Sequence, residues 1–155
     1  MDTSGITEYL DALGLGNPIR ARVEGLIPAF QFLSDEPIQR VFLAELEPER
    51  DEAGLRWESL WGFSEHFWYQ ARTFMSTEHD IDVSLLKDSV SYIGFSCTDV
   101  AFTDGHPGQF TDHSRMKLEV ETGGHIYSPV AATGFNCEAL STVISEYLTP
   151  NLRRG

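Results

Sequence analysis

The sequence predicts an α+β fold that is mainly β, an antiparallel barrel or sandwich of about six or seven strands. Apolar residues recur at helical spacing near both ends of the chain, and from residue 37 onward they alternate with polar ones. The chain has 155 residues, 41% of them hydrophobic, which suits one globular domain. We therefore expect a single domain over 1–155, with a helical extension at 1–36 and the strands and C-terminal helix at 37–149.

Helices are expected at both ends. Apolar residues at 6–13 follow the i, i+3, i+4, i+7 spacing of an amphipathic helix. The pair Asn17-Pro18 gives a cap followed by proline at the first helical position, so a second helix begins there, and Pro28 should kink or end it. Asn136 starts a C-terminal helix whose apolar residues lie on one face.

The strands are predicted from alternation and from turn residues between them. They cover residues 38–46, 55–71, 80–86, 89–96, 99–104, 115–122 and 125–132. Gly123-Gly124 is typical of a tight hairpin turn between the last two strands.

All three tryptophans lie in the stretch 55–74. Its odd positions are mostly apolar and its even positions mostly polar, which indicates one half-buried strand or two strands meeting near Gly62. This parity predicts that Trp57 and Trp61 share the core face, together with Phe63, Phe67 and Tyr69.

The same parity places Leu60, His66 and Trp68 on the polar face. A large apolar side chain there is either covered by another element, for which the N-terminal helices are available, or exposed to a partner. Tryptophan is a favoured hot-spot residue of interfaces. Trp68, Leu60 and His66 are therefore the candidate partner-binding residues.

The charge of the chain restricts its partners. Eleven Lys and Arg stand against 24 Asp and Glu, a formal net charge of −13. Binding to nucleic acid or to an anionic membrane needs clustered basic residues, so neither is expected. A basic protein or peptide is the more suitable partner. No secretory signal is expected at the start, so the expected location is cytoplasmic.

One loop has side chains suited to metal or acid–base chemistry. Asp104, His106, Asp112 and His113 lie within 103–115, and oxygen and imidazole groups there are weak candidates for a divalent metal. Their spacing matches no strong metal signature, and a structural loop rich in turn residues has the same composition. The sequence contains no phosphate-binding loop, dinucleotide fingerprint or nucleophile elbow, so we expect no cofactor and no catalytic activity.

The order of consecutive antiparallel strands followed by one amphipathic helix over 37–149 resembles the pleckstrin-homology-like (PH-like) barrel. The resemblance rests on the aromatic second strand at 57–69, the segment 80–96 and the terminal helix at 136–148. It implies a scaffold for protein or peptide contacts. Membrane-targeting members bind phosphoinositides through a basic loop between their first two strands, whereas here that loop, 47–54, is acidic, so this activity is not carried over.

The leading hypothesis is thus a non-catalytic acidic adaptor domain that binds a protein or peptide, beside the C-terminal helix at an exposed strand edge or around Trp68. A barrel that carries a small apolar ligand is the alternative, and a metal-dependent hydrolase using the 104–113 loop is the third. Association of the chain with itself stays open.

Overall fold

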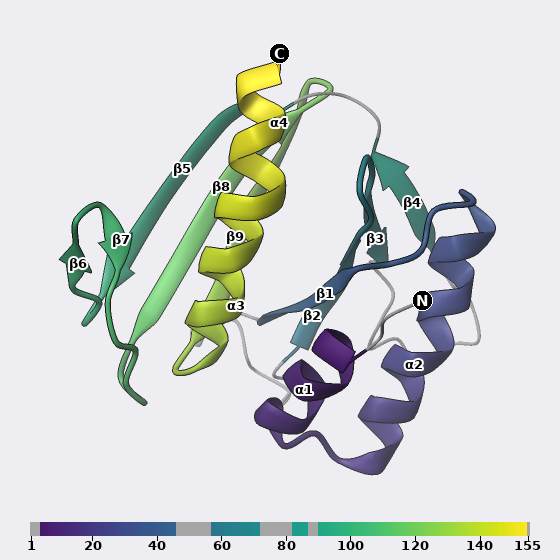
Figure 1. Ribbon diagram of the computed structural model, residues 1–155, viewed down its shortest axis with the longest axis horizontal. Helices are drawn as coiled ribbons and strands as arrows, with labels where there is room; N and C mark the ends of the chain where they lie inside the picture. The colour runs from purple at the N-terminus through teal and green to yellow at the C-terminus, as the bar shows by residue number, and fades with distance from the viewer. Residues whose placement is uncertain (1–3, 46–56, 72–81, 87–89, 155) are drawn as a thin grey trace. The chain divides into compact units, whose positions relative to one another are not determined.

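The computed structural model describes residues 4–45, 57–71, 82–86 and 90–154 (Figure 1). The chain forms two compact units. The first unit comprises Met1–Ala44 and Glu52–Lys87, and the second comprises Glu45–Asp51 and Asp88–Gly155. The prediction of a single domain over 1–155 stays a prediction.

The first unit combines two helices with four strands. The helices are α1 (Ser4–Leu13) and α2 (Asn17–Phe32), and the strands are β1 (Arg40–Glu45), β2 (Trp57–Phe63), β3 (Trp68–Ala71) and β4 (Val83–Leu86). The strands lie in the order β4-β3-β2-β1, with β2–β3 and β3–β4 antiparallel. Glu45, the last residue of β1, is counted with the second unit.

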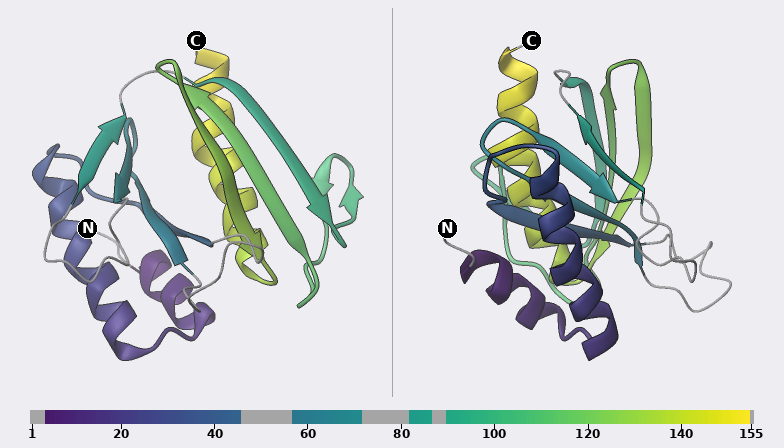
Figure 2. Two further views of the ribbon diagram at one scale, coloured as in Figure 1. Left: turned by 180° about the vertical axis from the view of Figure 1, so that it is seen from behind. Right: turned by 90° about the vertical axis from the view of Figure 1, so that its right-hand side faces the viewer.

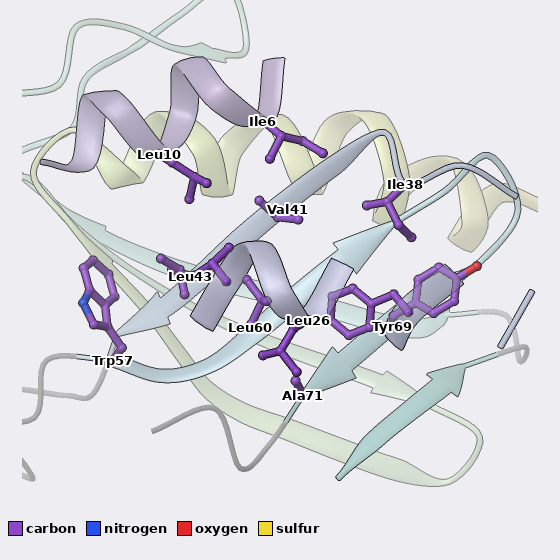
Figure 3. Packing of buried hydrophobic residues seen from close by; sticks show 12 residues of the cluster. Ile6, Leu10, Leu26, Ile38, Val41, Leu43, Trp57, Leu60, Tyr69 and Ala71 are labelled. Atoms are coloured by element: carbon purple, nitrogen blue, oxygen red, sulfur yellow. The ribbon is translucent and has the colours of Figure 1, made fainter. Parts of the chain in front are cut away.

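The two N-terminal helices share one hydrophobic core with the strands. Ile6 and Leu10 of α1 and Phe30 of α2 are buried against side chains of β1, β2 and β3 (Figure 3). Helix α2 starts with proline in its first turn, as predicted, but continues through Pro28 to Phe32. The helices are therefore an integral layer of the first unit, where the sequence predicted an extension beside the strands.

Phe30 and Gly62 explain how closely α2 approaches the sheet. A Cβ atom placed on Gly62 would lie 2.7 Å from Cδ2 of the Phe30 ring. The ring centroid of Phe30 is 5.5 Å from that of Tyr69, which pairs with Gly62 across the β2–β3 ladder. Glycine in a strand interior often marks such a close approach.

The second unit consists of strands and a C-terminal helical segment. Its strands are β5 (Val90–Thr98), β6 (Phe102–Thr103), β7 (His106–Pro107), β8 (Arg115–Thr122) and β9 (His125–Thr133). They are followed by α3 (Asn136–Val143), the π-helical turn η2 (Ile144–Leu148) and α4 (Thr149–Arg154). Strands β9-β8-β5 are antiparallel in that order, and β6 pairs with β7 in a small hairpin.

The C-terminal helix lies along one face of the β9-β8-β5 sheet (Figures 1 and 2). Met116, Leu118 and Val120 of β8 alternate with exposed residues and are buried, as the sequence predicted. Leu140 and Val143 of α3 are also fully buried. Gly123 and Gly124 both have positive φ, 57° and 80°, which the predicted hairpin turn requires.

The architecture is thus α+β with mostly antiparallel strands and a C-terminal helix, as predicted. The helical segment runs to Arg154, beyond the predicted end at 149; Pro150 directly follows the π-helical turn η2 within this continuous segment and does not end it. Within the described ranges, no helix is both long and apolar enough to cross a membrane.

Candidate functional site

The predicted faces of the aromatic stretch are wrong for β3. Strands β2 and β3 form a hairpin in which Phe63 pairs with Trp68 and Trp61 with Gln70. Paired residues lie on the same face, so odd positions of β2 share a face with even positions of β3. The parity of the sequence therefore reverses across the turn at 64–67, and Trp68 lies with Trp61 and Phe63.

These three side chains form a packed aromatic cluster with Phe42 of β1. The ring centroid of Trp61 is 4.6 Å from that of Trp68 and 6.1 Å from that of Phe42. The rings of Phe63 and Trp68 are stacked, with centroids 6.2 Å apart. Such distances are those of interacting aromatic pairs in a protein core.

The side chains of Trp68 and Leu60 do not present the exposed patch that the sequence suggested. Trp68 is 5% exposed, in the aromatic cluster. Leu60 is fully buried in the core that α1 and α2 share with the strands. Of the two alternatives that the sequence left open, Leu60 follows the first and is covered by the N-terminal helices, whereas Trp68 is buried among aromatic rings.

His66 does lie at the surface, and it belongs to a polar network. Its Nδ1 atom is hydrogen-bonded to Oε1 of Glu36, and its backbone N–H donates to Oε2 of Glu36 at 3.1 Å. Ser64 donates to the same Oε2 atom at 2.7 Å, and its hydroxyl lies 3.3 Å from that of Tyr69, which is also hydrogen-bonded to Ser34. The network ties the segment after α2 to the β2–β3 turn.

The network sets the protonation of Glu36. Burial acts to raise the pKa of this carboxyl, but the hydrogen bonds from Ser64 and His66 outweigh burial, so the pKa lies below its usual value. The arrangement differs from a nucleophilic triad, because Ser64 donates to the carboxylate and the imidazole bonds to the other carboxylate oxygen, so the histidine is not placed between the serine and the acid. The network is best understood as a structural connection.

In the second unit, all four weak metal candidates lie in the segment between β5 and β8, but they do not share one site. Across the described ranges, no three His, Cys, Asp or Glu side chains gather where one ion would bind them. Asp104 is in the β6–β7 turn with φ 53°, and His106 follows it in β7. Asp112 and His113 precede β8 in a separate turn. The structure thus does not assemble the predicted cluster.

Ser114 fixes this loop. Its side chain is fully buried, and its hydroxyl donates to the Asp99 carbonyl at 2.8 Å and accepts from the Thr111 N–H at 2.9 Å. The Ser114 carbonyl accepts from the N–H of Gly134, at the end of β9, at 2.8 Å. The loop is therefore anchored to the start of the C-terminal helix.

The anchored loop forms one wall of an open groove of about 520 Å³. The loop contributes five consecutive residues, and the other wall is the C-terminal helix with the residue before it. The groove is lined by His106, Pro107, Gly108, Gln109, Phe110, Phe135, Glu138, Ser141, Thr142 and Ser145. A volume of this size is typical of ligand pockets.

Among the strands that the structure describes, β5 pairs with β8 alone and forms an edge of the sheet. Phe95 of β5 is 50% exposed and Phe102 of β6 is 44% exposed, with ring centroids 5.9 Å apart. Phe135, in the groove, is 63% exposed. Phe95 and Phe102 thus form an exposed aromatic pair at the β5 edge, and Phe135 lies in the groove.

The sequence indicated the strand edge beside the C-terminal helix but not the groove residues. Glu138, Ser141, Thr142 and Ser145 follow the i, i+3, i+4, i+7 spacing of one helical face. This polar face was the signal available in the sequence. No pattern in the sequence indicates that Ser114, which shapes the opposite wall, is buried.

Glu45, the last residue of β1, is a buried acid that contacts the start of α3. Glu45 accepts hydrogen bonds from the backbone N–H and hydroxyl of Thr133, both at 2.7 Å, and from the Asn136 amide at 3.0 Å. Burial, followed by the negative charge of Glu45, raises the pKa of the Cys137 thiol to about 11. Both cysteines are free, and Cys137 is buried and protonated at neutral pH, which suits a structural residue.

Comparison with known proteins gives no relative for the chain: no family model, no curated protein and no solved structure matches it.

Proposed function

We propose that the chain is a non-catalytic binding module of the PH-like type that takes an extended, basic peptide segment of a protein partner along β5. The observation that carries the proposal is the open edge of this nine-residue strand beside the aromatic pair Phe95 and Phe102.

An edge strand offers unpaired backbone N–H and C=O groups, and an extended peptide satisfies them by adding a strand. Proteins that avoid this commonly protect an edge with charged residues, proline or a very short strand. Strand β5 contains no proline and no charged residue over Val90–Thr98, and the register shift in its pairing with β8 lies at its start, between Val90 and Tyr92. Its exposed aromatic side chain, Phe95, adds apolar area for alternate side chains of the peptide.

Charge favours the same kind of partner. The net charge of −13 speeds the encounter with a basic segment and disfavours acidic ones. The antiparallel strands followed by a helix agree with the resemblance to PH-like domains, which supports, at the level of fold, a scaffold for peptide contacts. We include a cytoplasmic location in this proposal.

The test is selection of a displayed library of random 12-residue peptides on the whole protein, followed by amide hydrogen exchange with an enriched synthetic peptide. We expect exchange to slow about tenfold or more at the β5 amides that point away from β8. Protection at β4, the edge strand of the first unit, with none at β5 would overturn the proposal, as would a library without enrichment.

A pair of variants separates specific from general apolar binding. The double variant Phe95→Ser/Phe102→Ser should weaken the enriched peptide about tenfold or more. Phe32→Ser removes a side chain that is 88% exposed on α2 and should leave the affinity unchanged. Equal losses in the two variants would contradict strand addition at β5.

A further inference from the structure

We infer that the groove between the 106–110 segment and the C-terminal helix is a subsite for an arginine side chain, in which Glu138 pairs with the guanidinium group and Phe110 and Phe135 flank it. The inference rests on the proposed function, because it names the residue that the bound peptide places beside β5.

The helical wall of the groove presents hydrogen-bond acceptors. Thr142 donates its hydroxyl proton to the Glu138 carbonyl at 3.0 Å, and Ser145 donates to the Thr142 carbonyl at 3.3 Å. Ser141 donates to the Met116 sulfur at 3.6 Å. Each hydroxyl therefore donates its one hydrogen bond within the protein. Its oxygen lone pairs remain available to accept hydrogen bonds from a ligand.

Glu138 adds a full negative charge to this wall. Glu138 lies in the first turn of α3. Its carboxylate makes no hydrogen bond or ion pair with any residue in the described part of the chain. Of the other lining residues only His106 can ionise. A groove wall of lone pairs and one carboxylate suits a cation with many donors and does not suit a phosphate or a carboxylate ligand.

Arginine fits this wall better than lysine does. The guanidinium group has five N–H donors in a planar fork, so it can reach the carboxylate and the hydroxyl oxygens at once. Its flat face also stacks on aromatic rings, which Phe110 and Phe135 provide among the lining residues. The volume of about 520 Å³ exceeds the need of one side chain and leaves room for the adjoining peptide backbone.

The test uses defined probes on the whole, isotope-labelled protein and needs no selected peptide. Nα-acetyl-arginine amide is titrated in parallel with Nα-acetyl-citrulline amide, which has nearly the same shape but no charge. We expect the arginine probe to shift the amide resonances of Phe110, Phe135 and Glu138 with a Kd at least tenfold below that of citrulline, and to bind more weakly as salt rises. Equal binding of the two probes would overturn the inference.

Two variants assign the charge to one residue. Glu138→Gln keeps the size of the side chain and should raise the Kd of the arginine probe about fivefold or more. Glu119→Gln removes the same charge from the exposed face of β8, away from the groove, and should change the Kd less than twofold. Equal effects would mean that only the overall charge attracts the probe, and the subsite would be refuted.

The subsite and strand addition can fail separately. If peptides protect the β5 amides but arginine and citrulline bind alike, the subsite is wrong and the proposed function stands. If arginine binds at Glu138 but no peptide protects β5, the groove is a cation site and strand addition is wrong.

Discussion

Apart from Phe32 of α2, which is 88% exposed, the large aromatic residues of the two units differ in burial. In the first unit Phe30, Phe42, Trp61, Phe63 and Tyr69 are among the largest fully buried side chains of the chain. In the second unit, by contrast, Tyr92, Phe95, Phe102 and Phe135 are 44–63% exposed. Aromatic burial contributes strongly to stability, whereas exposed aromatic groups commonly mark contact sites. The comparison agrees with the proposal above, in which the first unit mainly stabilises the fold and the second unit offers the surface proposed to bind a peptide.

The polar groups differ in the same direction. In the first unit, Glu36 is closed off by hydrogen bonds from Ser64 and His66. In the second unit, Glu138 faces an open groove. A carboxylate whose oxygens already accept hydrogen bonds within the fold has little capacity left to bind a ligand. A carboxylate that lines a groove without a partner can still accept hydrogen bonds from one.

Truncating one phenylalanine in each unit should show the largest difference. Phe30→Ala removes a fully buried ring from the core shared by α2 and the strands and should lower the free energy of unfolding by about 3–5 kcal/mol. Phe95→Ala removes a half-exposed ring and should cost less than about 1 kcal/mol. Urea denaturation measures both. Similar losses would refute the division of roles between the units.

Adding one methyl group to a strand glycine should give the next largest difference. In Gly62→Ala the new Cβ atom would meet the buried Phe30 ring at 2.7 Å, and we expect a loss of about 1–3 kcal/mol from overpacking. In Gly94→Ala it would meet the hydroxyl end of Tyr92 at 2.5 Å, but this side chain is half-exposed and can move away. The second substitution should therefore change stability by less than about 0.5 kcal/mol. A costly Gly94→Ala would show that Tyr92 is held in place.

A serine substitution tests whether the loop wall of the groove is rigid. Ser114→Ala leaves the Asp99 carbonyl and the Thr111 N–H without their buried partner, which should cost about 1–2 kcal/mol. It should also speed hydrogen exchange at Thr111 and weaken the arginine probe. Ser91→Ala removes an exposed hydroxyl that donates to the Glu121 carbonyl at 3.1 Å and serves as the control, with a change below about 0.5 kcal/mol. Equal stability of the two variants would mean that Ser114 does not hold the loop.

Local periodicity predicted those parts of the fold that depend on one element at a time. The alternation in 115–122 and the Gly123-Gly124 turn fixed β8, its buried face and its hairpin before any contact was known. The helices start at Asn17 and Asn136, within one residue of the predicted starts, but the predicted caps are wrong: the N-cap positions are Gly16 and Phe135, and neither makes a side-chain cap hydrogen bond. Each of these features is a short-range property of the backbone.

The faces of β2 and β3 required information that periodicity does not contain. A stretch read as one strand keeps its parity throughout, whereas the four residues 64–67 between paired strands reverse it. The error moved Trp68 to the wrong face and made it a candidate contact residue. The groove could not be predicted for the same reason. Its walls come from 106–110 and 135–145 and are joined through Ser114. No repeating pattern in the sequence connects Ser114 to the helix.

The smallest expected effect concerns Glu36 and is a dependence on pH. The pKa of Glu36 is lowered in the folded protein, so the ionised carboxyl stabilises the fold above its unfolded pKa, and this stabilisation is lost as the pH falls through the folded value. Glu36→Gln should therefore lower the free energy of unfolding by about 1 kcal/mol at pH 7, the size of a net hydrogen bond, and by progressively less as the pH falls through the folded pKa and the wild-type carboxyl becomes protonated.

Glu65→Gln, at the neighbouring exposed position in the β2–β3 turn, provides the matched control for the change in net charge. Its effect on stability should be below about 0.5 kcal/mol and nearly independent of pH. A Glu36→Gln difference that stayed constant between pH 7 and pH 3 would show that the hydrogen bonds from Ser64 and His66 favour the protonated carboxyl as strongly as the ionised one. The network around Glu36 would then not favour its charged form. Glu36 and Glu138 would no longer differ in how strongly the fold holds the charged carboxylate.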